Sequence, residues 1–170
     1  EKCNKYQIAI SQAGYPIKGL HKVIEAVALL CNEFPDIKVK VGGANIFGGN
    51  WIKGNSYGIY IRQLLKKYNL QDQFEFEGFL SADEMKQLLL ESNVFVCPSS
   101  IENSPNSLGE AMLLGVPCVA SDVGGIADML THNDEGFLYP FDDSYKMAFY
   151  IRKTFLEIED TKRRAECGRK

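Results

Sequence analysis

Short apolar runs alternate along the chain with segments whose apolar residues recur every three to four positions. The short runs are typical of β-strands and cover residues 6–11, 37–41, 74–76, 93–97, 118–121 and 136–139. The longer segments have the spacing of amphipathic helices and cover residues 19–34, 59–68, 82–91, 108–114, 126–130 and 142–158. This order predicts an α/β fold with a Rossmann-like, doubly wound parallel sheet, right-handed crossovers and helices on both faces. Residues 44–57 are predicted to form a long loop rich in glycine and asparagine.

Two Ser-x-x-Glu sequences lie at predicted helix starts. Ser81 and Glu84 fit a capping box, in which the first side chain and the third helical residue bond each other's backbone. Ser107 and Glu110 fit the same pattern. Glu110 is therefore open to two interpretations, as a helix cap or as a ligand contact.

Composition sets the class of protein. The chain has 170 residues, of which 45% are hydrophobic and 24% charged, and we expect residues 1–170 to form one domain of ordinary size. A net charge of -3 argues against nucleic-acid binding, which needs concentrated Lys and Arg. The basic residues 162–164, 169 and 170 are predicted to be a solvated helix end. No apolar run approaches the roughly 20 residues of a membrane span, and the abrupt start of the chain favours a fragment of a longer protein.

The cysteines and histidines give no catalytic motif. None of the five cysteines forms a C-x-x-C pair, and Cys31, Cys97 and Cys118 lie in apolar runs, where thiols behave as small hydrophobes. This usage favours a reduced, cytoplasmic protein with non-catalytic cysteines. His21 and His132 stand in no recognisable partner motif.

The densest candidate chemistry follows the fourth predicted strand. Glu102 lies on the loop after that strand and Glu110 in the first turn of the next helix, with seven residues between them. In open α/β sheets, ligands bind at this edge. Carboxylates accept hydrogen bonds from vicinal hydroxyls, and the N–H groups of about residues 107–110 would point toward a phosphate. Pro105 suits the first helical position, and Gly109 would let a ligand come close.

A second candidate loop covers residues 11–19. Lys18 could place a positive charge on a diphosphate there, with Gly14 and Gly19 keeping the backbone accessible. Gly43, after the next strand, either ends the strand or allows close approach of a ligand. Lys18 and Glu102 have the alternative of being ordinary solvated surface residues.

These motifs together resemble the signature of retaining glycosyltransferases of family 4, in the GT-B superfold. The family pattern is Pro-Ser, a Glu, seven residues, a Glu followed by Ala-Met, then Gly-x-Pro, Val-Ala-Ser and Gly-Gly. Here it reads Pro98-Ser99, Glu102, Glu110-Ala111-Met112, Gly115-Val116-Pro117, Val119-Ala120-Ser121 and Gly124-Gly125. Upstream, Pro16 and Lys18-Gly19 resemble the family's P-x-K-G loop, so the resemblance spans nearly the whole chain.

The resemblance implies roles for individual residues. Glu102 would contact hydroxyls of a donor sugar, Glu110 the ribose hydroxyls of a nucleotide, and Lys18 the diphosphate leaving group. Further groups would bind sugar and phosphate, and Phe79 and Leu80 the nucleobase. These further groups are Gly14, Gly43, Asn103, Ser104, Asn106, Ser107, Leu108 and Gly109. The chain departs from the family in two places. The family has an Arg five residues before the Lys, where this chain has Ala13. It also has Gly-Phe-Gly after the first Glu, where this chain has residues 103–105.

By this resemblance the chain is expected to be the C-terminal, donor-binding half of a glycosyltransferase. The enzyme would use a nucleotide-diphosphate sugar, retain configuration, need no metal and work in polysaccharide or glycolipid synthesis. The acceptor-binding N-terminal domain would lie outside this chain, leaving the fragment inactive alone, and a peripheral site at the inner face of the membrane is compatible with the parent enzyme. Two alternatives stay open: a GT-B relative with another reaction, such as a phosphorylase or an epimerase, and a non-catalytic α/β binding module.

Overall fold

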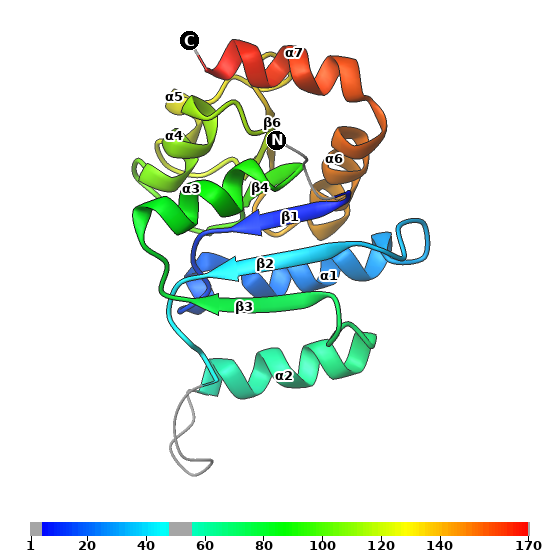
Figure 1. Ribbon diagram of the computed structural model, residues 1–170. Helices are drawn as coiled ribbons and strands as arrows, with labels where there is room; N and C mark the ends of the chain where they lie inside the picture. Colours follow the sequence, from blue (N-terminus) through cyan, green and yellow to red (C-terminus); the bar gives the residue numbers. More distant parts are fainter. Residues whose placement is uncertain (1–4, 48–55, 170) are drawn as a thin grey trace.

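The computed structural model describes residues 5–47 and 56–169 (Figure 1). Within these residues, six parallel strands form one sheet in the order β3-β2-β1-β4-β5-β6. The strands are β1 (Gln7–Ile10), β2 (Lys38–Gly42), β3 (Phe74–Gly78), β4 (Val94–Cys97), β5 (Cys118–Ser121) and β6 (Phe137–Tyr139). The predicted doubly wound parallel sheet is confirmed.

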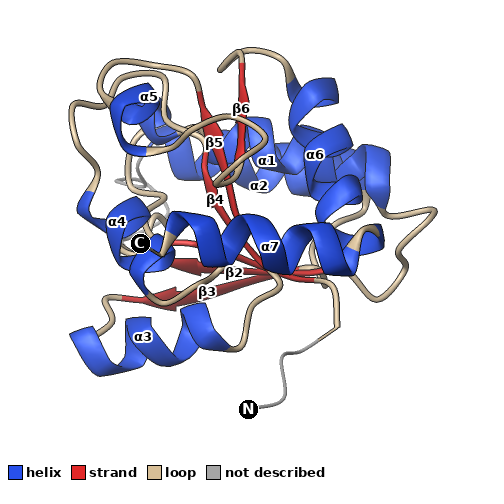
Figure 2. Cartoon of the chain, turned by 90° about the horizontal axis from the view of Figure 1, so that it is seen from above, coloured by secondary structure: helices blue, strands red, loops and turns tan. Residues whose placement is uncertain are grey.

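Helices cover both faces of the sheet (Figure 2). One face packs against α1 (Leu20–Leu30), α2 (Ser56–Tyr68) and α6 (Ser144–Leu156). The other packs against α3 (Ala82–Leu90), α4 (Asn106–Leu113) and α5 (Ile126–Met129). A short 3-10 helix, η1 (Pro16–Lys18), precedes α1, and the last helix is α7 (Ile158–Gly168).

The pleat of the sheet divides the core into two clusters. In β1, Ile8 and Ile10 point into the cluster under α1, α2 and α6, and Ala9 points into the opposite one. In β4, Val94 and Phe95 divide in the same way. All four residues of β1 and of β4 are buried. This explains why these strands read as continuous apolar runs rather than as alternating ones.

The strand order reverses between β1 and β4, which pair directly at the centre of the sheet. The chain leaves β1 toward α1 on one face and leaves β4 toward α4 on the other. The two loops therefore diverge, and the crevice between them is the usual ligand site of such sheets. The fold thus brings residues 11–19 and 98–105 to the same place.

The end of the chain differs from the prediction. The expected helix over 142–158 corresponds to α6, which ends at Leu156, but it is not the terminal helix, because α7 follows after Glu157 (φ -96°, ψ 66°). Helix α7 then packs against α4 and α6. Arg164, predicted to be solvated, is only 6% exposed and lies over the Phe137 ring at 4.4 Å. The burial of Arg164 depends on this packing of α7, which the local sequence pattern does not reveal.

Other boundaries shift by a few residues. Helix α1 ends at Leu30, and residues 31–33 form a turn rather than the last helical turn of the predicted 19–34 segment. Of the predicted loop 44–57, residues 56 and 57 already belong to α2, and residues 48–55 lie outside the described residues, as do Cys3 and Lys170. None of the described helices has the length and apolar character needed to cross a bilayer.

Candidate active site

A cleft of about 530 Å³ opens at the reversal point of the strand order. Its walls come from the ends of β1, β2, β3 and β4 and from the start of α4. It is lined by Ile10, Ser11, Gln12, Lys18, Gly42, Gly43, Phe79, Leu80, Met85, Val96, Cys97, Pro98, Ser99, Glu102, Ser104, Pro105, Asn106, Ser107 and Glu110. Both candidate loops thus contribute to one site.

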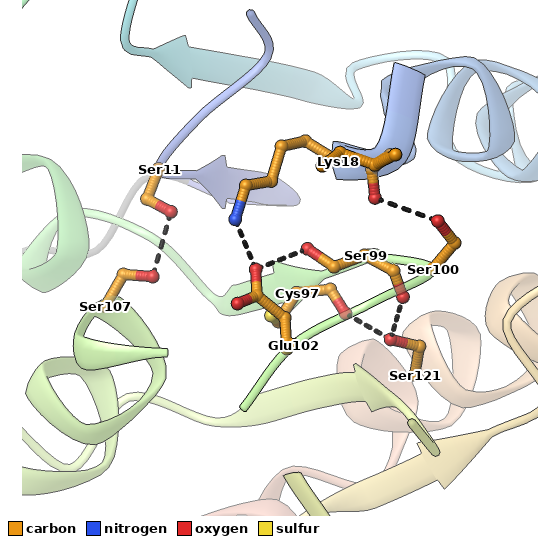
Figure 3. A network of polar contacts seen from close by, with 9 residues as sticks. Ser11, Lys18, Cys97, Ser99, Ser100, Glu102, Ser107 and Ser121 are labelled. Carbon is orange, nitrogen blue, oxygen red and sulfur yellow. Dashed lines mark hydrogen bonds and ion pairs between the residues drawn. The ribbon is translucent and has the colours of Figure 1, made fainter. Parts of the chain in front are cut away.

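Glu102 is held by two donors inside this cleft. Its Oε1 atom forms an ion pair with Lys18 Nζ and accepts a hydrogen bond from Ser99 Oγ at 2.8 Å (Figure 3). The side chains of Lys18 and Glu102 are 23% and 14% exposed. Neither residue is an ordinary solvated surface group, which removes that alternative for both.

The turn after β5 packs against the loop that carries Glu102 and holds it in place. A Cβ atom at Gly124 would lie 1.8 Å from the Glu102 carbonyl oxygen, and Gly124 has a φ of +53°. Only glycine allows this approach and this backbone conformation without strain. The N–H of Gly125 donates to the same carbonyl at 3.3 Å. Ser121, at the end of β5, donates through Oγ to the Ser99 carbonyl at 2.5 Å.

The segment that carries Lys18 packs directly against the loop that carries Glu102. A Cβ atom at Gly19 would lie 1.9 Å from the Pro98 carbonyl oxygen, so the glycine serves backbone packing here rather than ligand access. The Ser100 N–H also donates to the Ile17 carbonyl at 2.8 Å. These contacts place the Lys18 side chain over the cleft.

Helix α4 begins earlier than predicted. Asn106 is its first residue, and Pro105 is the N-cap rather than the first helical position. The N–H groups of Leu108 and Gly109 already donate to the Pro105 carbonyl at 3.0 and 3.3 Å. The N–H groups without a partner among the described residues are therefore those of Asn106 and Ser107, not those of 107–110.

The capping-box interpretation of Glu110 is wrong. Ser107 lies inside α4, and its Oγ accepts a hydrogen bond from Ser11 Oγ at 3.0 Å. Glu110 is exposed to the cleft. Its carboxylate makes no hydrogen bond or ion pair with any residue that the structure describes, so its acceptor capacity is available to a ligand.

Most of the predicted site residues line the cleft, and four do not. Those that do are Lys18, Gly43, Phe79, Leu80, Glu102, Ser104, Asn106, Ser107 and Glu110. Leu108 is fully buried in the core, and Gly109 faces Met129, because only one side of a helix can face the cleft. Gly14 is buried beside Ala44, and Asn103 lies outside the lining of the cleft.

Sequence reasoning missed other cleft residues. Ser11 and Gln12 lie in the second candidate loop but were not named as site residues, although their position at the carboxyl end of a central strand indicates such a role. Met85 reaches the cleft from α3. Ala13, which stands where the family has an arginine, is 1% exposed and belongs to the apolar core. Of the described residues lining the cleft, Lys18 alone carries a positive charge.

Cys97 and Cys118 are buried structural residues. Burial raises the pKa of Cys97 to about 11, and burial raises the pKa of Cys118 further, so both stay protonated thiols. The ring of His132 accepts the Leu138 N–H through Nδ1 at 2.9 Å, and burial lowers the pKa of His132. Among the described residues, no group of three or more His, Cys, Asp or Glu side chains is placed to hold a metal ion.

The fold and the cleft define a class of protein. A doubly wound sheet offers a hydroxyl-binding acid, a cation and a helix N-terminus at its reversal point, which suits a ligand that is both hydroxylated and anionic. Residues 2–170 match the family model of glycosyl transferases group 1. The chain belongs to this glycosyltransferase family, and its fold is that of the C-terminal half of GT-B enzymes.

Known relatives agree with this placement. The chain is 31% identical over 137 residues to WcaL of Escherichia coli (strain K12), a glycosyltransferase assigned to colanic acid biosynthesis. That match covers 77% of this chain and 31% of WcaL. The chain thus spans about a third of the length of this curated relative.

Solved structures show the same fold at lower identity. HepE of Anabaena, crystallised with UDP and glucose, has a TM-score of 0.87 at 24% identity, over 98% of this chain and 43% of HepE. The C-terminal domain of LpcC, a group 1 glycosyl transferase from Francisella tularensis, has a TM-score of 0.82 at 21% identity. That match covers 99% of this chain and 84% of the LpcC domain.

Proposed function

We propose that this chain is the donor-binding domain of a retaining glycosyltransferase, which moves a sugar from a nucleotide-diphosphate sugar to an acceptor hydroxyl. One observation carries the proposal. Lys18, Glu102 and Glu110, which come from two loops and a helix, converge in a single cleft at the reversal point of the sheet.

Each residue has a role that its surroundings support. Lys18 and the N–H groups of Asn106 and Ser107 bind the diphosphate. Glu102, held by Ser99, accepts hydrogen bonds from the donor sugar. Glu110, whose carboxylate is unpaired within the described chain, accepts those of the ribose.

The nucleobase lies against the outer rim of the cleft. Phe79, which follows β3, is 85% exposed although it is aromatic, and it lines the cleft together with Leu80. A base stacked on this ring would cover apolar surface that is otherwise in water. The polar side chains of Ser104 and Asn106 follow Glu102 in sequence, line the same cleft and help to bind the sugar.

The chemistry is the stabilisation of a leaving group. When the bond between sugar and diphosphate breaks, negative charge grows on the departing phosphate, and donors placed for that charge lower the barrier. Removal of one such donor typically costs about 3 kcal/mol. Among the described residues that line the cleft, Lys18 carries the positive charge. It contributes most of this stabilisation, and no metal is required. The product keeps the anomeric configuration of the donor.

The relatives support the choice of substrates. HepE has been crystallised with UDP and with UDP-glucose, and WcaL is assigned to colanic acid biosynthesis. We therefore propose a nucleotide sugar as the donor and polysaccharide synthesis as the process. In the proposed enzyme residues 1–170 form one domain, the acceptor binds to a further domain of a longer protein, and the enzyme is cytoplasmic, with peripheral membrane association.

Calorimetric titration of the chain with UDP, GDP and ADP tests the donor site. We expect saturable binding of one diphosphate and a loss of affinity of about 30-fold in Glu110→Ala, since a hydrogen bond to a charged group contributes about 2 kcal/mol. Glu166→Ala, an exposed acid on α7, is the matched control and should bind as the wild type does. Binding of none of the three nucleotides, or equal affinity in Glu110→Ala, would overturn the proposal. For the longer enzyme, the anomeric configuration of the product tests retention.

A further inference from the structure

The two donors to Glu102 are anchored very differently. Ser99 is buried, and its carbonyl accepts the Ser121 Oγ hydrogen bond at 2.5 Å. Ser121 also contacts the Cys97 carbonyl at 3.3 Å. Lys18 instead reaches Glu102 at the end of a long side chain that starts from a three-residue 3-10 helix. Figure 3 shows Ser99 on the same strand-end loop as Glu102, and Lys18 approaching across the cleft.

This geometry has a cost for anion binding. Without a ligand, the charge of Lys18 is already neutralised by Glu102, and the two side chains are largely withdrawn from water. A diphosphate that binds Lys18 must separate this ion pair. It must also bind close to the negative charge of Glu102 in the same cleft. Separation leaves a partly buried charge on Glu102 that needs new donors.

We propose that Lys18 changes partner when the donor binds, and that Ser99 is the positioning residue that keeps the Glu102 carboxylate in place during the exchange. This inference rests on the proposed function. The diphosphate takes the Lys18 ammonium, and hydroxyls of the sugar replace it at Glu102. An intact nucleotide sugar supplies both halves of the exchange, whereas a bare nucleoside diphosphate supplies only the first.

The exchange makes the site selective for the intact donor. After transfer, the sugar has left and Glu102 has lost its hydroxyl donors. Glu102 then recaptures Lys18, which weakens the hold on the product diphosphate. The ion pair therefore weakens binding of the product diphosphate. Its removal should raise the affinity for the bare diphosphate.

Titration of four forms of the chain tests the exchange: wild type, Glu102→Gln, Lys18→Met and the double variant. The ligands are the nucleoside diphosphate that the wild type binds and the matching monophosphate. We expect Glu102→Gln to bind the diphosphate about tenfold more tightly, since the ion pair no longer competes. In the Lys18→Met background the same change should alter affinity by no more than about twofold, because it then relieves only the direct repulsion between Glu102 and phosphate, and the cycle subtracts this contribution. Glu166→Gln controls for the lost charge.

Ser99→Ala tests the positioning role. It should lower the affinity for the nucleotide sugar and leave that for the bare diphosphate within about twofold, a split that a general loss of structure would not produce. Ser100→Ala is the control, since Ser100 lies next in the loop and its Oγ donates to the Ile17 carbonyl at 3.3 Å and to no other group of the described residues. Equal diphosphate affinity in Glu102→Gln and wild type would overturn the exchange alone. A wild type that binds none of the diphosphates would overturn the exchange together with the donor site.

Discussion

The starts of α3 and α4 carry the same Ser-x-x-Glu sequence and have different structures. At α3, Ser81 is the N-cap, and its N–H and Oγ donate to Glu84 Oε2 at 2.8 and 2.7 Å. At α4, Pro105 is the N-cap, so Ser107 and Glu110 lie two positions too deep in the helix to form the box. A Ser-x-x-Glu sequence therefore forms a capping box only when its serine is the N-cap of the helix.

The two starts are also stabilised by different contacts. The start of α3 is exposed and closed by its own side chains. The start of α4 is held by distant segments, through Ser11 on the β1 loop and through the turn after β5 that supports residues 102 and 103. Tertiary packing thus takes the place of capping at α4, and Glu110 stays available for a ligand.

The largest effect should come from the support under the α4 loop. Gly124→Ala places a Cβ atom 1.8 Å from the Glu102 carbonyl at a positive φ, and we expect a loss of about 3 to 4 kcal/mol in the free energy of unfolding. Gly78→Ala is the control, because Gly78 has a φ of +76° with nothing within 4 Å of an added Cβ. It should lose only about 1 kcal/mol. Equal losses in urea unfolding would show that packing under the loop is unimportant.

Replacement of Glu110 or Glu84 by alanine should have opposite consequences for ligand affinity and for stability. Glu110→Ala should reduce the affinity for the nucleoside diphosphate by about 30-fold and change the free energy of unfolding by less than about 0.5 kcal/mol. Glu84→Ala should leave affinity unchanged and destabilise the fold measurably, since it opens the capping box. Calorimetry and urea unfolding of both variants measure the two quantities. A destabilised Glu110→Ala would restore a structural role for this acid.

Double-mutant cycles separate a capping box from two unrelated side chains. For Ser81→Ala with Glu84→Ala, we expect a coupling of at least about 0.5 kcal/mol in the free energy of unfolding, because the two residues bond each other. For Ser107→Ala with Glu110→Ala the coupling should be close to zero, since Ser107 bonds Ser11 instead. Comparable coupling in both cycles would contradict the comparison.

The smallest expected effect is on how the free energy of unfolding depends on pH. Hydrogen bonds from the Ser81 N–H and then from its hydroxyl hold the pKa of Glu84 below its ordinary value of 4.5. A lowered pKa in the folded state means that the stabilisation is present above pH 4.5 and is lost as the pH falls through the folded pKa. In Glu84→Gln this part of the acid dependence should disappear from urea unfolding measured between pH 6 and pH 3. An identical acid dependence in the variant would contradict the capping box.

Much of the fold follows from local pattern. The run at residues 118–121 coincides with β5, and the box at Ser81 and Glu84 forms as predicted. Buried parallel strands need continuous apolar runs, and capping residues act on the backbone next to them. The packing of α7 and the burial of Arg164 were missed, because both depend on α7 folding back against distant elements.

The candidate site divides in the same way. The doubly wound α/β fold and the two loops that carry Lys18 and Glu102 could be predicted from sequence, because the periodicity of apolar residues marks each strand, each helix and the loops between them. The tertiary structure decided that Lys18 pairs with Glu102, that Ser99 and Ser121 hold this pair, and that Glu110 has no partner among the described residues. The Lys18–Glu102 pair joins side chains 84 positions apart, the Ser121 hydrogen bond spans 22 positions, and the free carboxylate of Glu110 depends on where α4 begins. Their energies arise only when the sheet brings the two loops together.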